Sequence, residues 1–373
     1  MIMINKRIIA ITAVLAFSLN ALSAQGRFEY GGDLAGGARN GTSSAVSLLI
    51  PQGAAYLSGG GAVATATGVG AAYWNPAGMA RATNNLETTF SQRSHFADMS
   101  VMFAGAAVKL GKNSFGISVR SLDVGEIPVT TVFAPDGTGE KFSPSNFTAG
   151  LTFSRMMSAK TSMGVTVNTT SEGFRRVKGT AMTVDAGVQY MDFLNVSGLD
   201  VGVAVRNFGR PMRYEGSGLL TKAVEVGTDR LTQFLKVEPA EFDVPMLFEI
   251  GMAYDVMPGL QVAGTYESNN FEQDKTKLMA SYSLPGLLTV RGGFLLEMET
   301  VERTDDSRTT TVDESSSRLK STTCTMAFHL VELFTFKDIL ELMHQSIMHI
   351  FQLVLTVLTQ VQFSHLTLDS RYN

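Results

Sequence analysis

Two neighbouring stretches decide the fold: residues 161–173 read TSMGVTVNTTSEG, and residues 176–191 read RVKGTAMTVDAGVQYM. In both, apolar side chains alternate with small or polar ones. The apolar set is Met163, Val165, Val167, Met182, Val184, Ala186 and Val188, and the other set is Gly164, Thr166, Asn168, Thr183, Asp185, Gly187 and Gln189. A period of two places the two sets on opposite faces of a β-strand. The stretches therefore predict strands with one apolar and one polar face.

The same pattern continues along the chain on both sides of these stretches. Twelve such segments follow one another, separated by Gly, Asn, Asp and Pro, with no helical pattern between them. They cover residues 86–96, 99–110, 114–124, 147–156, 161–173, 176–191, 197–208, 242–256, 260–268, 274–284, 287–297 and 322–328. This succession predicts an all-β fold of antiparallel strands.

The polar face of these segments distinguishes two kinds of β protein. A soluble β-sandwich hides its apolar face, and its outer face usually carries many charges. Here the second face is mainly Gly, Ser, Thr and Asn, with scattered Asp, Lys and Arg. That distribution favours a transmembrane β-barrel, in which the apolar face contacts lipid and the polar face lines the lumen. We therefore expect the apolar side chains to point away from the barrel centre.

Short and long connections alternate between the segments. Residues 111–113, 158–160, 257–259 and 284–286 are predicted tight turns, whereas 125–146, 210–241 and 300–321 are long and polar. Bacterial barrels place short turns on the periplasmic side and long loops outside. The mixed charges of the 210–241 loop favour a solvated surface. A protein-docking surface is the more specific but less favoured alternative.

Composition excludes several other classes of protein. The 373 residues include 30 Lys and Arg and 34 Asp and Glu, so the formal net charge is −4. Charged residues make up 17 % of the chain, against about 25 % in soluble domains. The mean hydropathy is +0.11, and the apolar residues are not gathered into the ~20-residue spans of a helical-bundle membrane protein. Because no basic stripe is present to neutralise phosphates, we expect no nucleic-acid partner.

The first part of the chain has the character of an exported protein. Residues 1–24 predict a secretory signal peptide: Lys6 and Arg7 precede an apolar stretch at 8–19, and small residues follow at 21–24. No cysteine follows to carry a lipoprotein anchor, and the single Cys324 allows no intramolecular disulfide. Residues 25–83, rich in Gly, Ala and Ser, predict a compact irregular segment with short helices.

Residues 329–358 depart from the alternating pattern. Phe336, Ile339, Leu340 and Met343 there follow helical spacing. A membrane-spanning helix is disfavoured, because 12 of the 27 residues at 342–368 are His, Gln, Ser or Thr. We interpret the stretch as either a divergent insertion or a disturbance of the reading frame. One strand within it and one at 361–372 would bring the total to 14, an even number as closed bacterial barrels prefer.

A series of motifs runs in order through residues 44–298. It begins with SAVSLLIPQGA at 44–54, GGGAVA at 59–64 and AYWNPAGMA at 72–80. It continues with GEIPVTT at 125–131, PSNFT at 144–148, RNFG at 206–209, MRY at 212–214, SNNF at 268–271 and VRGGF at 290–294. Together these motifs resemble those of the PorV/PorQ type of outer-membrane protein, a distant relative of the FadL hydrophobic-compound transporter family.

The resemblance implies a transmembrane antiparallel β-barrel of about 14 strands over residues 84–373, with residues 25–83 folded inside as a plug. It implies a structural plug motif, next to the first strand, made of Tyr73, Trp74, Asn75, Pro76, Ala77 and Gly78. The final Arg371, Tyr372 and Asn373 depart from the aromatic ending of such barrels.

Residues with catalytic or ligand-binding chemistry are sparse. Gly59 to Gly61 lack the preceding strand and the later acidic residue of a nucleotide-binding turn, so close packing of the plug is the favoured interpretation. His344 and His349 do not share a helical face, which disfavours a metal site. Tyr73 and Trp74 suit either ligand contact or wedging of the plug against the barrel wall, and wedging is favoured.

Other aromatic side chains are expected to face lipid or form interfacial girdles. These are Phe90, Phe96, Phe103, Phe115, Tyr190, Tyr254 and Tyr282.

The sequence thus predicts an exported outer-membrane barrel, in contact with outer-membrane lipid, without enzymatic activity, cofactor or metal. The first functional hypothesis is a PorV-type role in type IX secretion, in which the barrel docks exported cargo proteins and other secretion components. The alternative is FadL-like transport of hydrophobic small molecules across the outer membrane.

Overall fold

A computed structural model describes residues 41–53, 56–57, 59–97, 99–223, 233–284, 288–300 and 317–329. The predicted signal peptide at 1–24, the start of the predicted plug at 25–40 and residues 330–358 of the anomalous stretch lie outside these ranges. So do the predicted last strand at 361–372 and the two histidines His344 and His349.

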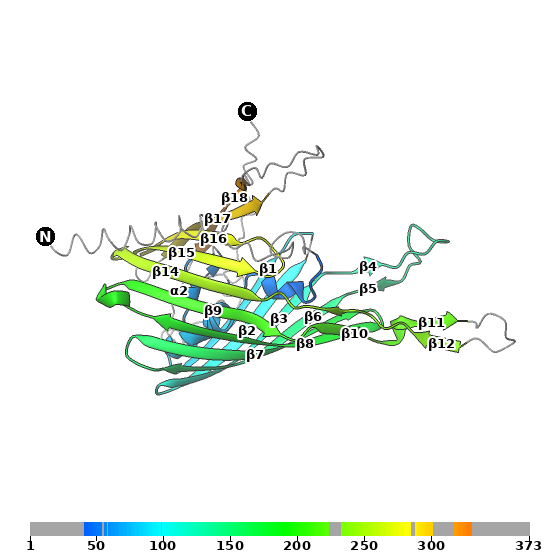
Figure 1. Cartoon of the computed structure of the whole chain (residues 1–373), viewed down its shortest axis with the longest axis horizontal. Coiled ribbons are helices and arrows are strands. Elements are labelled where there is room, and N and C mark those ends of the chain that lie inside the picture. The colour runs from blue at the N-terminus through cyan, green and yellow to red at the C-terminus, as the bar shows by residue number, and fades with distance from the viewer. Residues whose placement is uncertain are drawn as a thin grey trace, which may run out of the picture.

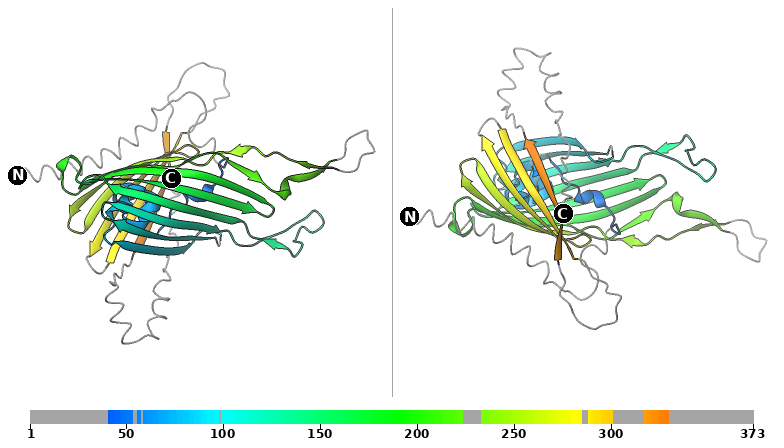
Figure 2. Two further views of the ribbon diagram at one scale, coloured as in Figure 1. Left: turned by 90° about the horizontal axis from the view of Figure 1, so that it is seen from below. Right: turned by 90° about the horizontal axis from the view of Figure 1, so that it is seen from above.

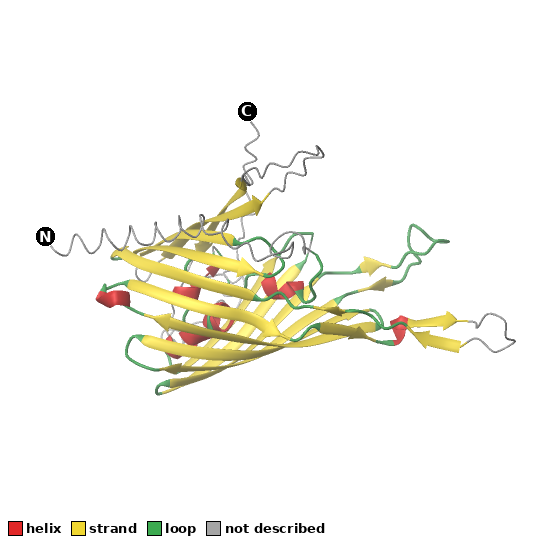
Figure 3. Ribbon diagram, viewed as in Figure 1, coloured by secondary structure: helices red, strands yellow, loops and turns green. Residues whose placement is uncertain are grey.

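One large antiparallel sheet makes up most of the structure (Figures 1 and 3). Its strands, in spatial order, are β1 (Leu86–Ser94), β2 (Ser100–Leu110), β3 (Asn113–Asp123), β6 (Ser145–Met156), β7 (Thr161–Phe174), β8 (Val177–Tyr190), β9 (Leu199–Gly209), β14 (Leu247–Met257), β15 (Leu260–Asn269), β16 (Lys275–Leu284), β17 (Leu288–Thr300) and β18 (Ser317–His329). Each of the twelve predicted segments corresponds to one of these strands, so the predicted all-β antiparallel class is confirmed.

The sheet curves into an incomplete barrel (Figure 2). β1 and β18 are its edge strands, and within the described ranges no pairing joins them. Two short strands, β10 (Met212–Glu215) and β13 (Glu241–Phe242), pair beside β8 and bring the sheet to 14 strands. The count matches the expected number, but β10 and β13 belong to the predicted 210–241 loop, whereas the sequence placed the two extra strands after residue 329.

The longest connections all lie at one end of the strands, which also carries the two-residue turn between β7 and β8. Tight turns join β2 to β3, β6 to β7 and β14 to β15 at the opposite end. At the end with the longest connections, two hairpins extend beyond the wall (Figure 1). One pairs β4 (Ile127–Pro128) with β5 (Lys141–Phe142), and the other pairs β11 (Leu220–Ala223) with β12 (Gln233–Lys236). We call these ends the turn end and the loop end.

The curved sheet forms the wall of the incomplete barrel. Its polarity is the reverse of that of a soluble protein, because apolar side chains lie on its outer face and polar side chains lie on its inner face. On β3, Phe115 and Ile117 are 49 % and 58 % exposed on the outer face, while Ser114 and Ser118 face inward and are buried. The same holds for the two stretches that decided the fold. There Met163, Val165 and Val167 are exposed, and Thr166, Asn168 and Asp185 are buried. The expected outward orientation of the apolar side chains is thus confirmed along most of the wall.

Strand β2 is an exception to this orientation. Val101 and Phe103 point inward and are buried, 3 % and 2 % exposed. The reason is packing: Phe103 belongs to an apolar cluster with Val69 and Trp74 of the preceding segment. Where an apolar part of that segment lies against the wall, the wall also presents apolar side chains inward.

Two of the seven aromatic residues expected to face lipid are therefore buried instead. Phe103 lies in the cluster just described, and Tyr254 of β14 packs with Leu199 of β9 on the outer face, together with Phe193 and Val196 of the β8–β9 connection. Phe103 points inward, against the expectation, because it packs on an internal cluster. Tyr254 points outward as expected, but the β8–β9 connection covers it, so it does not face lipid. The other five are exposed: Phe90, Phe96, Phe115, Tyr190 and Tyr282.

Residues 41–82, which we call the inner segment, lie on the concave side of the sheet (Figure 1, blue). The segment contains only short elements: η1 (Val46–Leu49), α2 (Ala62–Thr65), η3 (Gly68–Gly70), α3 (Ala71–Trp74) and η4 (Pro76–Arg81). Frequent glycine and the proline at the start of η4 keep these helices short. Among the described residues, no helix has the length and apolar character to cross a membrane.

Candidate functional site

The inner face of the sheet and the inner segment together form the candidate site. All six residues of the predicted motif, Tyr73, Trp74, Asn75, Pro76, Ala77 and Gly78, are buried there. Tyr73 and Trp74 end helix α3, and the other four form the start of η4. These six residues therefore lie together where the inner segment contacts strands β6 to β9.

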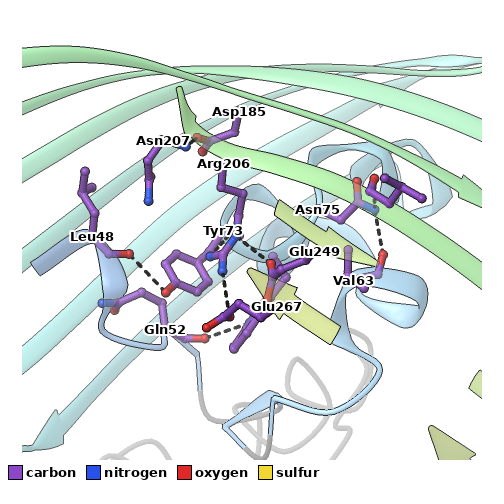
Figure 4. A network of polar contacts seen from close by, with 12 residues as sticks. Leu48, Gln52, Val63, Tyr73, Asn75, Asp185, Arg206, Asn207, Glu249 and Glu267 are labelled. Atoms are coloured by element: carbon purple, nitrogen blue, oxygen red, sulfur yellow. Dashed lines mark hydrogen bonds and ion pairs between the residues drawn. The ribbon is translucent and has the colours of Figure 1, made fainter. Parts of the chain in front are cut away.

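Asn75 joins the inner segment to the wall (Figure 4). Its Nδ2 lies 2.7 Å from the carbonyl oxygen of Val63, 3.2 Å from that of Val188 on β8 and 3.4 Å from that of Val203 on β9. Its Oδ1 accepts a hydrogen bond from the amide of Ala77, which caps η4. One fully buried amide side chain thus contacts backbone groups on four elements, and an apolar replacement would remove these hydrogen bonds.

Glycines in the wall permit the inner segment to approach the strands closely. A Cβ atom on Gly164 of β7 would lie 2.5 Å from the carbonyl carbon of Pro76, and one on Gly202 of β9 would lie 2.1 Å from the carbonyl oxygen of Val63. Both distances are below van der Waals contact, so a larger side chain would displace the segment. The other wall glycines in close contact with it are Gly105, Gly116, Gly187 and Gly251.

The predicted glycine cluster makes the reciprocal contacts. A Cβ atom on Gly60 would lie 2.6 Å from Cβ of Met279, and one on Gly61 would lie 2.3 Å from Cβ of Ala263. The amide of Gly61 donates a 2.8 Å hydrogen bond to Thr265 Oγ1. The structure therefore places these glycines against strands β15 and β16.

Tyr73 and Trp74 pack edge to face, with ring centroids 4.9 Å apart. The Tyr73 hydroxyl donates to the carbonyl of Leu48 (Figure 4). Trp74 Nε1 donates to the carbonyl of Gln52, so both bonds lie within the inner segment. The polar atoms of both aromatic residues are therefore used in holding the inner segment together.

A buried ionic cluster lies on the inner face of β9, β14, β15 and β16. Arg206 Nε lies 2.8 Å from Glu249 Oε2, and Lys277 Nζ lies 2.5 Å from Glu267 Oε2 and 3.7 Å from Glu249 Oε1. Glu249 and Glu267 are direct cross-strand partners, so each carboxylate needs a nearby cation. Two cations and two anions make the cluster neutral, and its interior position makes loss of one member costly.

The ionic cluster also holds the aromatic pair. The Arg206 guanidinium lies 4.7 Å from the Tyr73 ring centroid and 5.7 Å from that of Trp74, and it donates a 3.3 Å hydrogen bond to the Tyr73 carbonyl. A second guanidinium, that of Arg120 on β3, lies 5.3 Å from the Tyr73 ring. Tyr73 thus contacts two arginines by cation–π geometry.

Further polar groups on the inner wall are paired as well. Asp185 accepts hydrogen bonds from Asn168 Nδ2 at 2.7 Å and from the amide of Asn207 at 2.6 Å. Arg81, the last residue of η4, donates to Gln189 at 2.9 Å and pairs with Asp200 at 3.4 Å. Asn168, Asp185 and Gln189 lie on the polar face that the sequence predicted, whereas the alternation did not indicate the pairing of Arg81 with Asp200 or the ionic cluster.

At the loop end, Tyr214 of β10 donates a 2.7 Å hydrogen bond to Glu172 at the end of β7. Burial, together with this hydrogen bond and the charge of Glu172, raises the pKa of the Tyr214 hydroxyl above its usual value. The group therefore stays a neutral donor over the physiological range.

A small hollow lies between the inner segment and strands β2, β3 and β6, with room for about one water molecule. Within the part of the chain that the structure describes, no group of three or more His, Cys, Asp or Glu side chains lies close enough to hold a metal ion.

No protein-family model and no curated protein matches the chain. The chain is similar to several solved structures. The Pseudomonas putida toluene transporter TodX is 13 % identical, with 63 % of this chain and 81 % of TodX covered and a TM-score of 0.42. The CymD monoaromatic hydrocarbon channel is 12 % identical, with 63 % and 80 % covered and a TM-score of 0.42. The Ralstonia pickettii toluene transporter TbuX is 12 % identical, with 67 % and 94 % covered and a TM-score of 0.37.

Proposed function

We propose that the chain is an outer-membrane β-barrel that transports hydrophobic small molecules and that the inner segment is its plug. The observation that carries the proposal is the inverted wall: exposed apolar residues such as Ile117 and Leu151 outside, buried Thr152, Thr166 and Asp185 inside. An apolar outer band around a polar interior suits a hydrocarbon environment and is unfavourable in water.

Transport of apolar compounds needs an apolar passage between plug and wall. The hollow between the inner segment and strands β2, β3 and β6 has room for about one water molecule, far less than the ~300–1,000 Å³ of ordinary ligand sites. The structure therefore represents a closed state, and transport requires the inner segment to move. This movement would break the hydrogen bonds of Asn75 to β8 and β9 and the contacts of η4 with β6 and β7.

A cross-link across this contact tests the proposal. Ser154 Oγ of β6 accepts a hydrogen bond from the amide of Ala80 at 3.0 Å and donates to the carbonyl of Ala77. Cysteines at Ala80 and Ser154, in a Cys324→Ser background, would tie η4 to the wall. We expect bacteria that express the protein to take up the fluorescent hydrophobic dye 1-N-phenylnaphthylamine faster than bacteria without it.

In the oxidised double-cysteine variant this gain should disappear, and a reducing agent should restore it. The single variant Ser154→Cys in the same background is the matched control and should take up dye at the unmodified rate under both conditions. Equal uptake with and without the protein would contradict transport.

The two hairpins at the loop end favour docking of exported proteins as a second candidate function. Val132 and Phe133 at the end of the β4–β5 hairpin are 94 % and 99 % exposed, and Phe234 and Leu235 of β12 are also exposed. Apolar side chains held on projecting hairpins suit transient protein contacts. Serine at these four positions should abolish co-purification of exported proteins if docking is the function, and should leave dye uptake unchanged if transport is.

A further inference from the structure

Neighbouring connections form a continuous rim at the turn end of the wall. They are residues 111–112 between β2 and β3, 157–160 between β6 and β7, and 191–198 between β8 and β9. The amide of Met156 donates a 2.8 Å hydrogen bond to the carbonyl of Lys112, and the amide of Met191 donates one of 2.8 Å to the carbonyl of Lys160. These bonds hold the connections side by side, and we call the three together the turn-end rim.

Large apolar side chains project from the rim and from the strand end beside it. Leu110, Met157 and Leu194 are all more than half exposed. Leu194 also adopts the left-handed backbone region, with a φ of 52°, in a connection whose Phe193 packs on Tyr254 at the outer face of the wall. Exposure of such side chains to water costs free energy, so this end of the wall suits a partner that is in part apolar.

Two cations at the same end have no carboxylate partner among the described residues. Lys112 and Arg155 are exposed, and neither side chain forms an ion pair or a hydrogen bond there. Lys160, by contrast, lies 3.6 Å from Asp192 and donates a 3.3 Å hydrogen bond to Asn195. Because Asp192 is the only acid in the sequence of the turn-end rim, the charges of Lys112 and Arg155 stay uncompensated.

Arg155 lies at the border of the apolar outer face. Its cross-strand partners are Asn113 on β3 and Met163 on β7. Phe153, two residues before it on the same face, packs against Phe115 with ring centroids 5.2 Å apart, and both rings are exposed. The guanidinium therefore lies where the exposed apolar surface ends. In a membrane this is the depth at which acyl chains give way to polar headgroups, which long cationic side chains reach.

We propose that the turn-end rim binds the headgroup of an anionic glycerophospholipid, with Arg155 and Lys112 on its phosphate. Guanidinium and ammonium groups donate charge-assisted hydrogen bonds to phosphate oxygens, while Leu110, Met157 and Leu194 contact the first carbons of the acyl chains. A protein partner is less favoured, because lysine is depleted at protein interfaces.

The side of the membrane follows from the short connections. Bacterial barrels keep their short turns on the periplasmic side, so the bound lipid belongs to the periplasmic leaflet. The inference goes beyond the proposed function, since it concerns the lipid around the wall and not the compound that passes through it.

Fluorescence quenching by brominated lipids tests the site, because bromine on an acyl chain quenches only a tryptophan that the lipid contacts. Met157→Trp places a reporter on the rim, and the single natural tryptophan, Trp74, is buried in the inner segment and gives a constant background. The whole protein is reconstituted in mixed vesicles of dioleoylphosphatidylglycerol and dioleoylphosphatidylcholine, with either lipid brominated. The two lipids share their acyl chains and phosphate and differ in net charge.

We expect phosphatidylglycerol to bind at the reporter about fivefold more tightly than phosphatidylcholine, as for a basic side chain at an anionic membrane surface. The preference should disappear when Lys112→Gln and Arg155→Gln are combined, and higher salt should weaken it. Lys178→Gln, which removes an exposed lysine at the loop end of β8, is the matched control and should leave the preference unchanged.

The proposal is overturned by equal affinity for the two lipids, by an unchanged preference without the two cations, or by no quenching at all. The last result would mean that a second copy or another protein covers the rim. An unheated electrophoretic band identifies variants that remain folded, and Leu110→Trp serves as the reporter if Met157→Trp does not fold. Dye uptake separates the two proposals, because a lipid preference without dye uptake contradicts transport alone, and dye uptake without a lipid preference contradicts the lipid site alone.

Discussion

At the scale of single residues, the barrel interior depends on polar groups that satisfy one another without water. Glu249 and Glu267 face each other across β14 and β15, and only Arg206 and Lys277 make this pairing tolerable. Because Arg206 also donates to Tyr73, one side chain stabilises both the wall and the inner segment. The cluster should therefore behave as a unit in mutagenesis.

Replacement of Arg206 tests this coupling. In Arg206→Gln two buried carboxylates share one lysine, so we expect the free energy of unfolding to fall by about 3–5 kcal/mol. The double variant Arg206→Gln with Glu249→Gln removes one cation and one anion and should recover part of the loss. Urea unfolding in detergent micelles measures both. A single variant as stable as the unmodified protein would refute the role of the cluster.

At the scale of elements, the inner segment fits the wall because strands β7 and β9 carry glycine where its backbone approaches. The helices of the segment are too short to be stable alone, so their conformation depends on these contacts and on Asn75. The close fit therefore depends both on the short helices of the inner segment and on the glycines of the strands that face them.

Gly164→Val should disturb this fit, because the new Cβ would lie 2.5 Å from the backbone of Pro76. We expect η4 to shift and trypsin to cut after Arg81 about tenfold faster, since local opening exposes the bond. Gly292→Val on β17 is the matched control, because a Cβ there meets nothing within 4 Å. Equal cleavage rates in the two variants would show that the wall tolerates a side chain at Gly164.

At the scale of the whole molecule, the sequence predicts the wall well and its interior poorly. Alternation in residues 161–191 predicted the strands and the side on which Val165 and Thr166 lie, because a pleated strand leaves no other choice. It failed for Phe103, whose orientation depends on what lies inside, and it did not predict that the β8–β9 connection covers Tyr254 on the outer face. The ionic cluster joins residues up to 71 positions apart, Arg206 and Lys277. A local sequence pattern does not predict strand register over such separations.

A charge placed on the outer band should oppose insertion into a membrane. We expect Ile117→Arg to lower the free energy of unfolding from lipid vesicles by about 2–4 kcal/mol, the cost of arginine near the bilayer midplane. Val132→Arg, on the β4–β5 hairpin and outside the band, should change it little. Urea titration followed by unheated electrophoresis measures both, and equal effects of the two variants would mean that the apolar band does not contact lipid.

The neutrality of the Arg206–Glu249–Glu267–Lys277 cluster has an electrical consequence. A voltage across a membrane acts on net charge, at ~2.3 kcal/mol per elementary charge per 100 mV. Two positive and two negative groups held together experience almost no resultant force. A voltage difference between the two sides of a membrane would therefore leave this cluster at rest.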